Sequence, residues 1–154
     1  MAAFFFDSSA LVKRFAREAG SVWVFDLIKP SHGHTIYIAR ITAVEVVSAI
    51  VRRVRAGSIA STAGNRAVSR LERSLLLRYI FVEIQEPLIT RAMHLAKTHA
   101  LRGYDAVQLS AALNVSDGRL ETGASSITLI SADEALNAAA IAEGLQVDNP
   151  NLHP

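Results

Sequence analysis

The chain alternates short apolar segments with longer segments in which apolar side chains recur every three or four residues. The short segments predict buried strands at residues 2–6, 35–38, 79–84, 126–130 and 145–148. The longer ones predict helices at residues 8–16, 21–28, 42–55, 59–78, 87–99, 104–113 and 133–143. Strands that alternate with helices favour a mostly parallel sheet. We therefore expect an α/β protein with a three-layer α/β/α fold.

Two details of this pattern can be checked directly. The predicted helix at 42–55 carries an apolar stripe, made of Val44, Val47, Val51 and Val54. Residues 114–125 are polar and predict a loop. No repeat or linker divides the 154 residues, so we expect a single domain over 1–154.

Composition narrows the class of protein. Apolar residues make up 51% of the chain and charged residues 19%, which excludes a disordered tail. The chain has no cysteine, so disulfide frameworks, thiolate zinc sites and cysteine nucleophiles are excluded. The apolar run before Asp7 is too short for a signal or membrane segment. We expect a cytoplasmic protein without a membrane partner.

The net charge is only +2, but the basic residues are mostly arginine. Arginine forms bidentate contacts with phosphate, so a phosphate-bearing partner is plausible. On the helix that follows Asp7, Arg14 lies nearest the expected crevice and is our candidate substrate-binding residue, beside Lys13 and Arg17. A second group, at Arg66, Arg70 and Arg73, is more typical of a solvated helix surface.

Two acids directly follow apolar segments. Asp7 comes after residues 2–6, and Asp133 comes shortly after residues 126–130. Each has a purely structural interpretation, Asp7 as a helix N-cap and Ser131-Ala132-Asp133-Glu134 as a capping box with the serine as the cap. The carboxyl ends of parallel strands border the crevice in which such sheets bind ligands. Their shared placement favours a site over two unrelated caps.

Two further acids lie within predicted helices. Glu45 has the small or semi-polar neighbours Thr42 and Ser48 on its face, although a solvated surface glutamate would also fit. Asp105 lies on a face with Gln108, Leu109 and Ala112, which predicts burial, and a buried carboxylate needs a partner or a metal. Its alternatives are a favourable helix dipole or an ion pair with Arg102.

Carboxylates gathered in one crevice repel one another and raise one another's pKa unless a cation is bound. Oxygen ligands without cysteine or histidine favour Mg²⁺ or Mn²⁺ over zinc. A metal of this kind suits phosphodiester hydrolysis, because it activates a water and neutralises charge on the phosphate. The histidines of the loop at 31–34 lack further ligands, and we exclude His32 and His34 from the site.

The motifs Phe5-Phe6-Asp7-Ser8-Ser9-Ala10-Leu11-Val12-Lys13, Tyr104-Asp105-Ala106 and Ser131-Ala132-Asp133 together resemble those of the PIN-domain nucleases, and in particular the VapC-type toxins. The resemblance extends from Phe5 to about Gly144. Ser131 stands where threonine is common, which keeps the hydroxyl. By position, the resemblance implies catalytic roles for Asp7, Glu45, Asp105 and Asp133, metal binding by Asp7, Asp105 and Asp133, and supporting roles for Ser8, Ser131 and, more weakly, Ser9.

The resemblance also implies a function. Such a protein is a Mg²⁺- or Mn²⁺-dependent endoribonuclease, usually a homodimer, made beside a small antitoxin whose tail blocks the active site. The alternatives are a PIN-domain nuclease that processes RNA without being a toxin, and a catalytically silent PIN-like binding module. Phosphoaspartyl enzymes are disfavoured, because Ser9 stands where their second acid would be and no lysine ends a late strand.

Overall fold

The computed structural model describes residues 1–154 and contains one five-stranded sheet in the order β3-β2-β1-β4-β5. Every neighbouring pair of strands is parallel. The strands are β1 (Ala3–Phe6), β2 (Thr35–Ala39), β3 (Ile80–Val82), β4 (Thr128–Ile130) and β5 (Gln146–Asp148). The predicted parallel sheet is confirmed.

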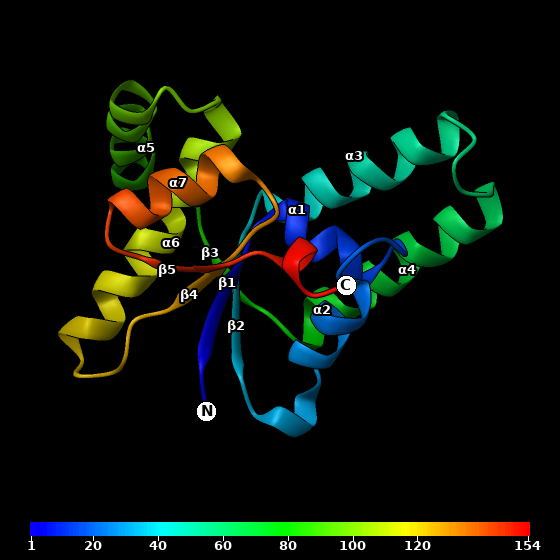
Figure 1. Ribbon diagram of the computed structural model, residues 1–154, viewed down its shortest axis with the longest axis horizontal. Coiled ribbons are helices and arrows are strands. Elements are labelled where there is room, and N and C mark those ends of the chain that lie inside the picture. The colour runs from blue at the N-terminus through cyan, green and yellow to red at the C-terminus, as the bar shows by residue number, and fades with distance from the viewer.

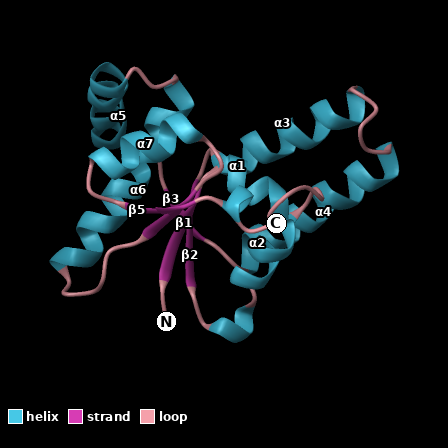
Figure 2. Ribbon diagram, in the orientation of Figure 1, coloured by secondary structure: helices cyan, strands magenta, loops and turns pink.

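Helices cover both faces of this sheet (Figure 1). The helices α5, α6 and α7 lie on one face and α1 to α4 on the other, which confirms the three-layer α/β/α fold (Figure 2). None of them has the length and apolar character needed to cross a bilayer. Their bounds are α1 (Ser8–Leu11), α2 (Ser21–Leu27), α3 (Thr42–Arg55), α4 (Ser61–Leu77), α5 (Glu86–His99), α6 (Gly103–Glu121) and α7 (Glu134–Ala142).

The central strand β1 divides the core in two. Successive side chains of a strand point to opposite faces. Accordingly Phe5 packs in the cluster that contains Leu109 and Leu129, while Phe6 packs with Leu11 and Ile38. Both phenylalanines are fully buried. This burial on both faces fixes the end of β1, and with it the position of the next residue, Asp7.

The sheet has a topological switch between β1 and β4. From β1 the chain builds outward through β2 and β3 on one side, and later through β4 and β5 on the other. At the carboxyl ends of the two strands, the backbone N–H of Asp7 donates to the carbonyl of Ile130 at 3.2 Å. Parallel sheets bind ligands at such a point, because the following loops diverge there.

The helix α6 is longer than predicted. Residues 114–121 continue it, so the prediction of a loop over 114–125 is wrong for most of its length. The polar residues are accommodated as a helix surface: Arg91 of α5 donates to Asn114 at 2.9 Å and to Asp117 at 2.8 Å. Val115 packs against the core. Contacts with α5 thus override the polar composition.

The apolar stripe predicted for α3 is wrong in part, because Val47 packs against the core and Val54 is half-buried, but the other two valines are exposed. Val44 and Val51 are 68% and 41% exposed, whereas Val46 and Ile50 are buried against the sheet. Both sets of apolar residues have helical spacing, and the packing of α3 against its neighbours selects the second. The first predicted helix is likewise shorter than 8–16, since α1 is followed by a 3-10 turn over Val12–Arg14.

Candidate active site

Asp7 lies at the switch point and caps α1. Its Oδ1 accepts from the backbone N–H of Ala10 at 3.0 Å, as the N-cap interpretation predicts. Its carboxylate also accepts from Ser9 Oγ at 2.7 Å and from Ser131 Oγ, which follows β4, at 3.2 Å. The side chain is therefore both a cap and a fixed group at the meeting point of two strands.

Burial dominates the charge state of Asp7. Only 2% of the residue is exposed, and this burial raises the pKa of its carboxyl to about 7. The hydrogen bonds from Ser9, Ala10 and Ser131 lower that pKa, and the charge of Glu45 raises it further. The carboxyl is thus held in place by hydrogen bonds, and no arginine or lysine side chain compensates its charge.

Glu45 is half-buried in the first turn of α3, which excludes the interpretation as a solvated surface residue. Gln108 Nε2 donates to its Oε1 at 2.7 Å and Ser8 Oγ donates to its Oε2 at 3.2 Å. Burial raises the pKa of Glu45, and the charge of Asp105 adds to this rise. Ser8 therefore reaches this acid, whereas Ser9 and Ser131 reach Asp7.

Gln108 was not among the predicted site residues. It is buried in α6, and besides Glu45 it contacts Thr42, with its Nε2 donating to Thr42 Oγ1 at 2.9 Å. The only feature of the sequence that could have pointed to Gln108 is its amide, which lies on the predicted buried face of an apolar helix, one turn after Asp105. A buried amide needs partners, but the sequence does not say which.

Arg102 joins the other two acids. Its Nε donates to Asp105 Oδ2 and its Nη2 to Asp133 Oδ2, each at 3.0 Å. The pKa of Asp105 is raised by burial, an effect that Arg102 opposes. The predicted pairing of Arg102 with Asp105 is confirmed, and the same guanidinium also reaches Asp133, although the arginine side chain is 80% exposed.

The predicted capping box at 131–134 is wrong. The N-cap of α7 is Asp133, whose Oδ1 accepts from the N–H of Leu136 at 2.9 Å. Ser131 instead accepts from the N–H of Asp133 at 3.1 Å. The helix begins two residues later than the box requires, because the hydroxyl of Ser131 is directed to Asp7 and to the turn after β4.

All four acids line one cleft of about 700 Å³. The charges act along a chain of neighbours, since Glu45 raises the pKa of Asp7, Asp105 that of Glu45, and Asp133 that of Asp105. The structure therefore brings the predicted acids together. They form no group of three or more ligands already close enough to hold a metal ion.

The structure does not bring Arg14 to this cleft. Its guanidinium lies over the ring of Phe25, 4.4 Å from the centroid, in a separate cavity that Arg70 and Tyr79 also line. The expected placement of Arg14 near the crevice is thus corrected: the 3-10 turn after α1 directs it toward α2 instead. Lys13 is buried and bonded to Glu18, Ala19 and Asn151, so it is not free for phosphate.

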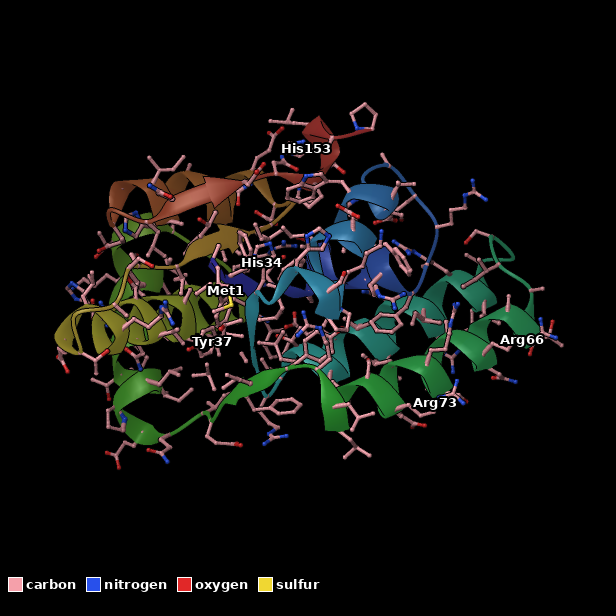
Figure 3. All side chains as sticks on the ribbon, turned by 90° about the horizontal axis from the view of Figure 1, so that it is seen from below. Met1, His34, Tyr37, Arg66, Arg73 and His153 are labelled. Atoms are coloured by element: carbon pink, nitrogen blue, oxygen red, sulfur yellow. The ribbon has the colours of Figure 1, made fainter.

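The remaining candidates lie away from the acids. Arg66 and Arg73 project from the outer side of α4 (Figure 3), in agreement with a solvated surface. His34 accepts from the N–H of Ala2 at 3.2 Å, and His32 lies near Asp26. Neither histidine lines the acidic cleft, as expected from their exclusion.

Several solved structures share this fold. FitAcB from Neisseria gonorrhoeae aligns with a TM-score of 0.65 and 17% identity over 96% of this chain and 97% of that chain. VapBC2 from Rickettsia felis, solved with a DNA fragment from its promoter, aligns at 0.61 and 13% over 96% and 98%. A toxin-antitoxin complex from Klebsiella pneumoniae aligns at 0.61 and 19% over 97% and 98%.

Sequence comparison identifies the family. No curated protein matches the chain. The family model described as the PIN domain matches residues 4–142, a range that contains all four acids of the cleft, the strands β2, β3 and β4, and β1 except for its first residue. This match covers far more than half of the sequence and agrees with the resemblance carried by the three motifs. The chain therefore belongs to the PIN domain family.

Proposed function

We propose that this protein is a divalent-metal-dependent endoribonuclease and the toxin of a type II toxin-antitoxin pair. The observation that carries the proposal is the gathering of Asp7, Glu45, Asp105 and Asp133 in one cleft at the switch point, where no arginine or lysine side chain pairs with the buried carboxyl of Asp7. We treat residues 1–154 as one domain that acts in the cytoplasm, as a homodimer.

The donor set fits Mg²⁺ or Mn²⁺, because it consists of carboxylates whose mutual repulsion a hard divalent cation would relieve. Asp7, Asp105 and Asp133 would hold the ion. Arg102 would compete with the ion, since it occupies one oxygen of Asp105 and one of Asp133. When bound, the ion supplies a water of lowered pKa and neutralises charge on the phosphate.

The protein's own groups divide the remaining work. Glu45 is held by Gln108 and Ser8 at the edge of the acid cluster, and its raised pKa suits it to orient a water and accept its proton. Ser9 and Ser131 hold Asp7 in one orientation. Rigid support of this kind keeps the carboxylates in position while substrate binds.

Two comparisons support an antitoxin partner. One related fold was solved as a toxin-antitoxin complex, and another as VapBC2 bound to promoter DNA. We propose accordingly that a small antitoxin binds this chain and blocks the cleft. A non-toxin RNA-processing nuclease would use the same acids, and a silent binding module would keep the fold without the activity.

The decisive experiment is cleavage of a mixed RNA pool by the pure protein with Mg²⁺, Mn²⁺ or EDTA. Asp105→Asn is run beside it, with Asp117→Asn as the matched control, since Asp117 lies on the same helix but pairs with Arg91 outside the cleft. We expect metal-dependent cutting by the wild type and by Asp117→Asn, and none in EDTA or with Asp105→Asn.

Cutting that persists in EDTA would refute the metal-dependent mechanism. Absence of cutting with either metal, in a protein whose fold is verified, would favour the binding module. Cutting without growth inhibition when the gene is expressed alone would favour the RNA-processing nuclease.

A further inference from the structure

A second cavity adjoins the acidic cleft. It has a volume of about 640 Å³ and shares Ser8, Ser9, Glu45, Arg52 and Tyr104 with the first. The two cavities therefore form one groove, which we call the RNA groove. Glu45 lies on the boundary between them, and Asp7, Asp105 and Asp133 line the first cavity only. A strand that passes through the groove has to contact the side chains at the boundary.

Arg52 is a free cation on this boundary. It lies seven residues after Glu45 in α3, which places it two turns along the same side of the helix. It is exposed and has no carboxylate within ion-pair distance. Its neighbour Arg53, in contrast, pairs with Glu18 at 2.6 Å. No contact within the chain accounts for the placement of Arg52 beside the acids.

Tyr104 is a free aromatic ring on the same boundary. It directly precedes Asp105 in the first turn of α6 and is 62% exposed. No other ring of the chain stacks on it. An aromatic side chain is not needed to bind a phosphate. It does bind an unpaired base, because every base has a flat face that can stack on the ring. An exposed tyrosine next to a site for phosphodiesters therefore points to base contact.

We propose that Arg52 and Tyr104 bind the nucleotide next to the scissile phosphate, with the guanidinium on its phosphate and the ring stacked on its base. This inference rests on the proposed nuclease activity. A polyanion that approaches four carboxylates is repelled, and Arg52 offsets that repulsion at the entry to the cleft. A base can stack on Tyr104 only when it is free of a duplex, so the groove selects unpaired RNA.

The test measures equilibrium binding of a fluorescein-labelled oligouridylate in EDTA, by anisotropy over a range of salt concentrations. A labelled hairpin duplex serves as the second probe. The variants are Arg52→Ala, Tyr104→Ala and Tyr104→Phe, with Arg55→Ala as the matched control. Arg55 is an exposed arginine of the same helix that lines neither cavity.

We expect Tyr104→Ala to weaken binding of the single strand by about 5- to 150-fold without a change in salt dependence, and Tyr104→Phe to bind like the wild type. Arg52→Ala should weaken binding and reduce the slope of log K against log salt by about 0.7, the contribution of one phosphate contact. Arg55→Ala should change neither quantity, and the duplex should bind more weakly than the single strand.

The inference would be overturned if Arg52→Ala and Arg55→Ala changed the affinity for the single strand equally. It would also be overturned if the wild type bound both probes equally and Tyr104→Ala did not weaken binding. If Arg52→Ala and Tyr104→Ala bind RNA like the wild type, and the wild type cuts RNA with Mg²⁺, the inference fails but the proposed nuclease activity is supported. If Arg52→Ala and Tyr104→Ala show the expected losses of RNA binding but the wild type cuts no RNA, the proposed activity fails and the inference about RNA binding in the groove is supported. A wild type that binds neither probe also overturns the inference, and cleavage with Mg²⁺ then decides the proposed activity separately.

Discussion

Gln108 of α6 donates a 2.7 Å hydrogen bond to the Oε1 of Glu45 in α3. The two helices cover opposite faces of the sheet, so this bond crosses the edge at which the strands end. Gln108 is 1% exposed and also contacts the buried hydroxyl of Thr42. The orientation of Glu45 therefore depends on a residue that does not itself line the acidic cleft.

Gln108→Glu tests this positioning role. The change conserves shape but sets a second carboxyl against Glu45, which raises the pKa of Glu45 further. If Glu45 accepts a proton during cleavage, the acidic limb of the pH–rate profile moves to higher pH, by roughly one unit or more. Initial rates of RNA cleavage over a pH series measure the shift. Gln146→Glu, on the exposed end of β5, is the control, and an identical shift there would contradict the role.

The positions of Asp7 and Asp133 could be predicted from the sequence because they follow from local rules. Asp7 directly follows a buried strand, and Asp133 caps the helix that follows another, so a parallel sheet alone brings them to one edge. Local rules also allow the pairing of Asp105 with Arg102, three residues away, but not the partners that lie far away in the sequence. Gln108 reaches Glu45 across 63 residues, and Ser131 reaches Asp7 across 124.

Errors arose where a local pattern had two solutions. Two apolar stripes of α3 have helical spacing, and only packing decides that Ile50 rather than Val51 is buried. Arg14 follows Asp7 closely in sequence, but the backbone tightens into a 3-10 turn after α1 and carries the guanidinium to Phe25. Tertiary contacts settle such cases, and a single sequence does not reveal them.

Asp7 makes the metal-free protein sensitive to pH. Its pKa is about 7 in the folded state against an ordinary value of 3.8, so between these values the folded state binds more protons than the unfolded chain. The free energy of unfolding therefore falls as pH rises through this window. Asp7→Asn keeps a capping side chain without the charge. We expect it to remove that fall, which amounts to at most about 4 kcal/mol.

Urea unfolding in EDTA between pH 5 and 8 measures this difference. Asp117→Asn makes the same chemical change on an exposed surface and should leave the pH dependence of the wild type intact. Parallel curves for Asp7→Asn and the wild type would show that the carboxyl of Asp7 is ionised throughout the window.

Gly64 sets the distance between α3 and α4. A Cβ at this position would lie 2.4 Å from Cγ2 of Val54. Alanine gains about 1 kcal/mol of helix propensity, but overpacking costs about 1–3 kcal/mol. We expect Gly64→Ala to lower the free energy of unfolding, and Val54→Ala to restore part of it in the double variant. Gly118→Ala, at an open and exposed site in α6, should stabilise the protein in the same assay.

Arg102 competes with a metal ion for the same oxygens. It donates to Asp105 Oδ2 and Asp133 Oδ2, and both bonds are lost if a cation takes those positions. Because the arginine side chain is 80% exposed, solvent and salt screen its contacts with the acids, so that these contacts are weak. Arg102→Ala should therefore tighten Mn²⁺ binding by about 5-fold in calorimetry.

Arg91→Ala is the matched control for Arg102→Ala. Arg91 also pairs with an exposed aspartate, Asp117, but lies outside the cleft. The Arg91→Ala variant should bind Mn²⁺ with the affinity of the wild type. Weaker Mn²⁺ binding by Arg102→Ala would instead mean that Arg102 holds Asp105 and Asp133 in the geometry that the ion needs. The two results separate a competitor from a support, because removing a competitor strengthens binding and removing a support weakens it.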